Sequence, residues 1–302
     1  TANTYLNRGR ARNEQGRYAK AEADFSEAIP RFKQANDPQN VAHTYFRRGN
    51  IRKNRGKHAQ AEADFTSAIP HLKRANASGR VIAGAHSSCA SMQSGQGKYA
   101  EAEANLTEAI SFFKQADASQ EVVRAYSDRG DTRFKQDKHH EAESDYTEAI
   151  QRLGQDSASQ QAARVYNNRG LARLEENKCA AAERDFTEAI RYYEQAQTPG
   201  QGAHASYFNR GLARRDQNKH IGAEADFTKA LLHFSEQVHS PRNRADAYYY
   251  RGNARSKQGK HSGAEADYTE AISCYEGMQT SQQNANAYFN RGDTRAKQEK
   301  YV

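Results

Sequence analysis

The sequence predicts an all-α fold, a solenoid built from tandem helix–turn–helix repeats. A tyrosine, or once a histidine, recurs every 40 or 41 residues, and a glycine follows four residues later at every recurrence except Ala90. After each glycine come a residue that can end a helix and then, in the first seven repeats, a helical stripe of apolar residues. Such a period indicates repeats that bury their apolar faces only by stacking on one another. The recurring residues are Tyr5, Tyr45, His86, Tyr126, Tyr166, Tyr207, Tyr248 and Tyr288.

We expect one domain over residues 1–302, with seven full repeats and a C-terminal half repeat. The repeat starts are expected near residues 2, 38, 79, 119, 159, 199, 241 and 281. A hydrophobic share of 36% and a mean hydropathy of −1.09 are polar for one globule of this length, but they suit a thin, extended core. The strict period and the 17 tyrosines and 12 phenylalanines argue against disorder.

Capping residues mark where the first helix of each repeat begins and ends. Three sites place a capping oxygen before a first-turn proline: Asp37-Pro38, Thr198-Pro199 and Ser240-Pro241. Serines can cap four other first helices: Ser78, Ser119, Ser159 and Ser281. The expected ends are Gly16, Gly56, Gly97, Asp137, Asn177, Asn218, Gly259 and Glu299. Glycine and asparagine suit these ends because they tolerate the left-handed conformation.

An apolar stripe defines the second helix of each repeat. In the first repeat its residues are spaced at i, i+4, i+7, i+8 and i+11, which is a helical pattern. They are Ala21, Phe25, Ala28, Ile29 and Phe32. Small alanines let a partner helix approach, and the aromatic ring fills the space beside them. Pro30 and Pro70 fall inside this helix in the first two repeats, where they predict a kink or a local break.

Arginines stand where the first helix should face the core. The pairs are Arg8/Arg12, Arg48/Arg52, Arg129/Arg133, Arg169/Arg173, Arg210/Arg214, Arg251/Arg255 and Arg291/Arg295. An aspartate recurs in the second helices: Asp24, Asp64, Asp145, Asp185, Asp226 and Asp267. Only the third repeat loses both, with Cys89 and Gln93 for the arginines and Asn105 for the aspartate. We therefore predict partly buried Arg–Asp pairs, against the alternative of solvated charge on a helix flank. A glutamate two residues before each aspartate position, such as Glu22, requires another or an additional partner.

The Tyr–Gly pair, Gly16-Arg17-Tyr18, Ala21, Phe25 and Ala28 resemble the tetratricopeptide repeat. Arginine replaces the usual leucine before the glycine, and the usual proline after the second helix is missing or displaced. The period exceeds the common value of about 34 residues and is closer to the extended repeats of kinesin light chain. The resemblance covers nearly all of the chain. It implies a right-handed superhelix whose first helices line a concave groove for a peptide or a partner helix, and a non-enzymatic, adaptor-like role.

Groove positions follow from the place of the glycine in each first helix. We select polar and aromatic residues two before or one after it: Asn7, Arg47, Asn50, Asp128, Asp131, Asn168, Asn209, Tyr250, Asn253 and Asn290. An asparagine side chain can pair with both the N–H and the C=O of a bound backbone. The series therefore predicts a sequence-tolerant peptide groove, although asparagine is also an ordinary surface residue.

One basic residue follows the turn between the helices in every repeat and accounts for the net charge of +8. This basic row consists of Arg17, Lys57, Lys98, Lys138, Lys178, Lys219, Lys260 and Lys300. Such a row could attract an acidic partner or a polyanion, or be ordinary solvated surface. With a sequence pI of about 9.3, nucleic-acid binding by an α-solenoid is the alternative function. It is disfavoured because the arginines are expected to face inward and few aromatic rings stand ready to stack on bases.

Other features of the sequence leave several expectations open. No nucleotide, hydrolase or metal motif is present, so we expect no enzyme activity, no cofactor and no metal. No apolar run is long enough for a membrane span. Three widely spaced cysteines favour free thiols in a reducing compartment, such as the cytoplasm or an organelle interior. The first residue, Thr1, favours a fragment or a processed form. End-to-end self-association is a further option, and the polar third repeat, His86 to Gly97, is either a ligand notch or a degenerate unit.

Overall fold

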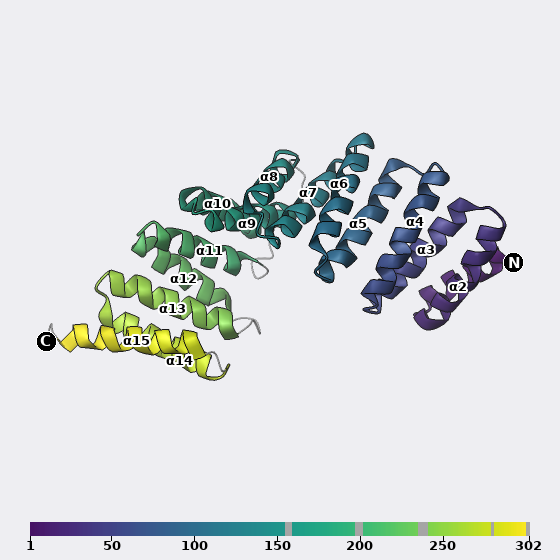
Figure 1. Ribbon diagram of the computed structural model, residues 1–302. Coiled ribbons are helices and arrows are strands. Elements are labelled where there is room, and N and C mark those ends of the chain that lie inside the picture. The colour runs from purple at the N-terminus through teal and green to yellow at the C-terminus, as the bar shows by residue number, and fades with distance from the viewer. Residues whose placement is uncertain (155–158, 197–201, 235–240, 279–280, 300–302) are drawn as a thin grey trace. The chain divides into compact units, whose positions relative to one another are not determined.

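The structure, a computed structural model, describes residues 1–154, 159–196, 202–234, 241–278 and 281–299 (Figure 1). These ranges contain helices and no strand, so the fold is an all-α solenoid of helix–turn–helix repeats. The first helices of the repeats are α1 (Ala2–Glu14), α3 (Pro38–Asn54), α5 (Gly79–Gly95), α7 (Ser119–Phe134), α9 (Ser159–Glu175), α11 (Ala203–Asp216), α13 (Pro241–Lys257) and α15 (Ser281–Glu299). The second helices are α2 (Tyr18–Gln34), α4 (His58–Arg74), α6 (Tyr99–Gln115), α8 (His139–Gln151), α10 (Cys179–Gln195), α12 (His220–Phe234) and α14 (His261–Glu276).

The chain divides into two compact units, residues 1–153 with α1 to α8 and residues 154–302 with α9 to α15. Within each unit every helix packs against the helices that precede and follow it. In the second unit α11 also contacts α9 and α13, and α13 contacts α15, so the first helices of neighbouring repeats adjoin one another. Each repeat is thus a helical hairpin stacked on the next hairpin of its own unit.

The turns between the two helices have the predicted left-handed residues. The φ angle is +71° at Gly16 and Gly56, +59° at Asp137 and +60° at Asn177. The amide of Arg17, the third residue after the end of α1, donates back to the Arg12 carbonyl at 2.8 Å and closes the helix end. Gly97, Asn218 and Gly259 also have positive φ, and α15 ends at Glu299.

The helix starts follow the sequence prediction less closely. The Asp37 side chain caps α3 by accepting from the Asn40 amide at 3.0 Å, as predicted. Ser78 stands at the cap of α5 without a side-chain bond, and Ala118, rather than Ser119, caps α7. Ser159 and Ser281 are the first residues of α9 and α15. The predicted caps Thr198 and Ser240 lie outside the described residues.

The local breaks expected at the two internal prolines do not occur. Helix α2 runs from Tyr18 to Gln34 through Pro30, and α4 runs from His58 to Arg74 through Pro70. Both rings lie on exposed positions near the ends of their helices. The physical reason is position: an exposed ring in the last turns removes one bond of the helical ladder without disturbing the buried face.

The glycine of the first helix is required because an aromatic ring of the second helix lies against its Cα. A Cβ built on Gly9 would come within 2.7 Å of Phe25 Cε1, and one on Gly130 within 2.7 Å of Tyr146 Cε1. Gly49, Gly170, Gly211 and Gly252 meet the rings of Phe65, Phe186, Phe227 and Tyr268 in the same way. Where the ring is replaced by Leu106, the glycine is replaced by the buried Ala90. The exception in the glycine series is therefore a compensated pair.

The predicted Arg–Asp pairing is confirmed. Asp24, 2% exposed, accepts hydrogen bonds from Arg8 at 2.6 Å and from Arg12 at 2.7 Å. Every other recurring aspartate binds its two arginines at 2.6–3.0 Å: Asp64, Asp145, Asp185, Asp226 and Asp267. In the third repeat Asn105 takes this place and bonds to His86 at 2.8 Å and to Gln93 at 2.9 Å. Hydrogen bonds among these side chains take the place of the Arg–Asp pairs there.

Candidate functional site

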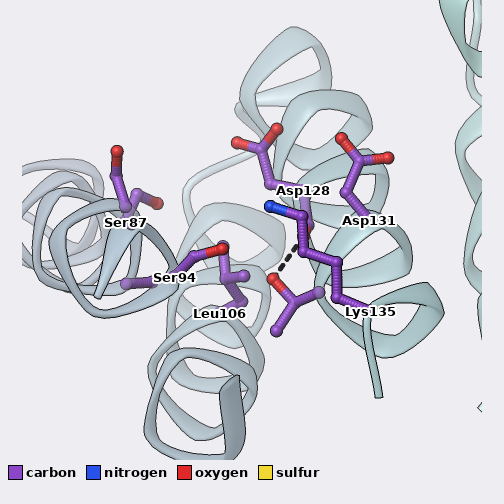
Figure 2. Close-up of a pocket in the computed structure, with 10 residues that line it drawn as sticks. Ser87, Ser94, Leu106, Asp128, Asp131 and Lys135 are labelled. Carbon is purple, nitrogen blue, oxygen red and sulfur yellow. Dashed lines mark hydrogen bonds between the residues drawn. The ribbon is translucent and has the colours of Figure 1, made fainter. Parts of the chain in front are cut away.

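A cavity of about 340 Å³ lies in the first unit, at the one repeat that departs from the pattern (Figure 2). Helices α5, α6 and α7 supply its walls. The lining residues are Ser87, Ala90, Ser91, Ser94, Gly95, Leu106, Asp128, Asp131, Thr132 and Lys135. Figure 2 shows Ser87 and Ser94 on one side and Asp128, Asp131 and Lys135 on the other.

The cavity accompanies the absence of two aromatic rings from the third repeat. In the second repeat the rings of Phe46 and Phe65 pack with their centroids 5.2 Å apart. Phe208 and Phe227 make the same contact at 5.6 Å. Ser87 and Leu106 occupy these two positions in the third repeat. The cavity of the third repeat is therefore lined by smaller side chains at these two positions than the second repeat has.

The walls of this cavity combine hydroxyl, carboxylate and apolar groups. Asp128 and Asp131 stand one turn apart on α7, and the Tyr146 hydroxyl donates to Asp131 Oδ1 at 2.7 Å. Ser87 Oγ is buried and has no hydrogen-bond partner in the described part of the chain. Leu106, 3% exposed, supplies apolar surface. A buried hydroxyl without a partner is costly, so the site offers an unused hydrogen-bonding group to a ligand.

A second cavity, of about 390 Å³, lies in the second unit. Most of its walls come from α11, α13 and α15, and its residues include Arg215, Asn218, His220, Asn253, Ala254, Ser256, Lys257, Tyr268, Asn290, Asp293 and Lys297. At its centre Asn253 Oδ1 accepts from Asn290 Nδ2 at 3.0 Å and from the Tyr268 hydroxyl at 2.8 Å. Asp293 pairs with Lys297 at 2.6 Å. The charge of this cavity is mainly basic.

The structure brings some of the predicted groove residues together. Asp128 and Asp131 share the first cavity, and Asn253 and Asn290 share the second. Asn168 and Asn209 are linked through Asn167, which donates to Asn168 Oδ1 at 3.3 Å and accepts from Asn209 Nδ2 at 3.2 Å.

The remaining groove candidates lie apart from these cavities or pack into the fold. The Tyr250 ring packs on Phe208 and Phe227, and the Arg215 guanidinium lies 4.9 Å from its centroid. Asn7 and Arg47 are exposed on α1 and α3, and Asn50 is half-buried. The groove positions predicted from the sequence omitted Lys135, Lys257 and Lys297, whereas Ser87 and Ser94 lie within the segment His86 to Gly97, which is predicted to be a notch or a degenerate unit. The signal for Ser87 itself is weak. The residue three before the glycine is large in five repeats but polar in two others as well: it is Leu6, Phe46, Phe208, Tyr249 and Phe289 against Ser127 and Asn167.

The glutamates of the second helices bind the next repeat within the same unit. Glu22 accepts from Arg52 at 3.0 Å, from Arg55 at 2.7 Å and from Lys57 at 3.0 Å. Four further lysines of the basic row bind the glutamate of the preceding repeat at 2.6–2.8 Å: Lys98, Lys138, Lys219 and Lys260. Lys178 bonds to Glu176, and Lys300 lies outside the described residues. Five members of the row therefore neutralise glutamates across repeat boundaries.

These contacts change the acidity of the glutamates. Burial alone would raise the pKa of Glu103, but hydrogen bonds from Lys138, Arg133 and Gln136 outweigh it and lower the pKa to about 2. The pKa of Glu183 falls to about 2 for the same reason, with Lys219, Arg214 and Gln217 as donors. Glu224 behaves likewise. The row therefore stabilises the stack of repeats as well as carrying positive charge.

Comparison with known proteins agrees with this geometry. Two family models described as tetratricopeptide repeat match residues 1–74 and 208–279. The C-terminal part of a tetratricopeptide repeat-containing protein from Cytophaga hutchinsonii is 13% identical, with a TM-score of 0.67, and the match covers 93% of this chain and 98% of that one. A tetratricopeptide repeat protein from Parabacteroides merdae is 18% identical, with a TM-score of 0.57, over 97% of this chain and 98% of that one.

A third similar structure is YrrB, described as a tetratricopeptide repeat protein with an unusual peptide-binding site. It is 16% identical, with a TM-score of 0.54, and the match covers 74% of this chain and 97% of that one. The comparison with curated proteins found no match. Within the described residues no helix has both the length and the apolar character needed to cross a bilayer. The recurring Tyr–Gly pair, the hairpin geometry and the two family matches together place the chain in the tetratricopeptide repeat family.

Proposed function

We propose that this chain is a non-enzymatic scaffold that binds an extended segment of a partner protein along its first helices. The observation that carries the proposal is that two cavities, one in each unit, are lined by the same positions of the repeat. Asp128 and Asn290 stand two residues before their glycines, Asp131 and Asn253 one residue after, and Lys135 and Lys297 five after. A periodic chain thus offers periodic recesses, which suit a ligand that is itself extended.

The chemistry of the recesses suits a polypeptide. Amide and hydroxyl groups at Asn253, Asn290, Ser91 and Ser94 can pair with the N–H and C=O groups of a bound backbone. Concave sites with apolar floors and a few polar groups are the usual form of ligand sites. The family typically supplies interaction scaffolds, and the similar protein YrrB is described by its peptide-binding site. Both points support the proposal, as does the absence of catalytic motifs from the sequence.

Nucleic-acid binding through the basic row receives less support. Five of its lysines are held by glutamates, which lowers the charge available to phosphates. An acidic protein partner and end-to-end self-association remain predictions from the sequence.

Panning a random peptide display library against the full chain tests the proposal. We expect enrichment of related peptides, and binding of a synthetic enriched peptide that weakens by about tenfold or more in Asn253→Ala/Asn290→Ala, because two central amides of the groove are lost. The matched control is Glu270→Ala, an exposed position on the second helix α14. The proposal fails if no peptide is enriched, or if neither these two asparagines nor the cavity residues Ser87, Asp128 and Asp131 affect binding of any enriched peptide.

A further inference from the structure

We propose that the cavity between α5, α6 and α7 is a specificity pocket for an arginine side chain of the bound segment. The inference rests on the proposed function, because the pocket lies on the same face of the repeats as the groove. It adds the chemical class of one ligand residue, a guanidinium carried on an aliphatic stem. The third repeat would then be the repeat that selects one side chain of the bound segment.

The third repeat lacks two rings that pack together in the second repeat, so small and aliphatic side chains line its cavity. Ser87 and Leu106 stand where Phe46 and Phe65 pack in the second repeat. The remaining floor, Ala90 and Leu106, is apolar and buried, at 1% and 3% exposed. An aliphatic stem can lie along such a floor while its charged head stays near polar groups. The dimensions and the polarity gradient of the pocket therefore match a long basic side chain.

The charge of the lining selects a cation. Three charged side chains line the cavity, the carboxylates of Asp128 and Asp131 and the ammonium of Lys135, which leaves one negative charge in excess. The second cavity differs, since Asn290 replaces Asp128 there and the basic side chains of Arg215, Lys257 and Lys297 outnumber the single carboxylate of Asp293. Coulombic attraction in a partly desolvated recess favours a single positive charge here.

The geometry of the acceptors favours guanidinium over ammonium. Two carboxylates one helical turn apart present several oxygens to the same space, and Ser87 Oγ opposite them lacks a partner in the described residues. A guanidinium has five N–H donors in a planar fork and can bond to acceptors on both sides at once. An ammonium is a compact point charge that satisfies fewer of them. Arginine is therefore the side chain whose several donors match a pocket lined by two carboxylates and a hydroxyl.

The experiment compares peptides selected by the full chain with those selected by pocket variants. We expect arginine to be enriched at one position of the peptides bound by the wild type. That preference should disappear in Asp128→Asn/Asp131→Asn, which keeps the shape, and in Ser87→Phe, which restores the ring found at Phe46. Glu148→Gln, which removes an exposed carboxylate of α8 outside both cavities, should leave the preference unchanged. Thermal melts verify that each variant is folded.

A synthetic enriched peptide gives the quantitative test. Replacing its arginine by citrulline, which has nearly the same shape without the charge, should weaken binding to the wild type by about tenfold or more. Binding to the Asp128→Asn/Asp131→Asn variant should change much less. The inference is overturned if citrulline and arginine peptides bind alike, or if lysine replaces arginine without loss.

The failure of this inference and that of the proposed function are distinguishable. If peptides are enriched without a basic residue and Ser87→Phe binds them normally, the arginine pocket is wrong while the groove remains. If no peptide is enriched, both are overturned, since the pocket is argued as part of the groove.

Discussion

Arg129 holds Asp145 through two parallel hydrogen bonds, from Nε to Oδ2 at 3.0 Å and from Nη2 to Oδ1 at 2.6 Å. Arg133 adds a third at 2.9 Å, so a carboxylate that is 2% exposed is surrounded by donors. The arrangement joins the two helices of the repeat by charge. Its repetition makes the ion pair part of the core.

Removing the carboxylate should be strongly destabilising. Asp145→Ala leaves two guanidinium groups without their acceptor, and we expect a loss of about 3–5 kcal/mol in the free energy of unfolding. Urea unfolding followed by circular dichroism measures it. Glu148→Ala is the matched control, because Glu148 pairs with Arg152 on an exposed helix flank and should contribute less than about 1 kcal/mol. Equal effects of the two substitutions would contradict a structural role for the buried pair.

The contact between Gly9 and Phe25 predicts a coupled pair of substitutions. Gly9→Ala should cost about 1–3 kcal/mol, because the added methyl group meets the ring at 2.7 Å. Adding Phe25→Leu should remove most of that penalty relative to Phe25→Leu alone, as the natural pair Ala90 and Leu106 indicates. A double-mutant cycle by thermal unfolding measures the coupling. Gly292→Ala, which meets nothing within 4 Å, should stabilise slightly through helix propensity; a loss there would contradict the packing argument.

The presence of Asn105 in place of the recurring aspartate leads to a third prediction. Asn105→Asp should destabilise by about 2–4 kcal/mol, since Cys89 and Gln93 offer no positive charge to a part-buried carboxylate. Adding Cys89→Arg and Gln93→Arg should restore most of the stability by rebuilding the pairing of the other repeats. Melting temperatures of the single and the triple variant provide the measurement. If Asn105→Asp alone is tolerated, the joint loss of the three residues has a different cause.

Acid should weaken the stack in a defined window. The pKa values of Glu103, Glu183 and Glu224 are about 2 in the folded chain, against an ordinary value of 4.5. Because the folded values are the lower ones, these contacts stabilise fully above pH 4.5 and are lost as the pH falls towards 2. Urea midpoints across pH 7 to 2 should fall in that range, and less steeply in Glu103→Gln. An unchanged slope in that variant would count against the contact.

The sequence predicts the bonds within a repeat better than those between repeats. Arg and Asp vanish together at Cys89 and Asn105, which indicates their pairing without any structure. The partners of Glu22 are 30 to 35 residues away, and identifying them requires the register of one hairpin on the next. A glutamine just before the turn is a sequence signal for these contacts. Five described glutamines bind the glutamate of the preceding repeat: Gln96, Gln136, Gln217, Gln258 and Gln298.

The candidate site was only partly predictable, for a related reason. Asp128 and Asp131 follow from their distance to the glycine, but the cavity beside them depends on what Ser87 and Leu106 fail to fill. Space left by small side chains has no pattern of its own in the sequence. The contact between Phe46 and Phe65 shows which side chains occupy these positions in the second repeat. The local breaks expected at Pro30 and Pro70 do not occur because both rings are exposed. This exposure decides whether the helix tolerates a proline, and the local sequence does not show it.

The third repeat lacks the Arg–Asp pairs between its own two helices but keeps the polar contacts to the repeats on either side. Gln93, Gln96 and Lys98 still bind Glu62, while Glu103 still binds Arg133 and Lys138. The contacts inside a hairpin and the contacts between neighbouring hairpins can thus vary independently. Single repeats can therefore be duplicated, exchanged or altered one at a time, because the residues that bind the neighbouring repeats are kept when the internal residues change.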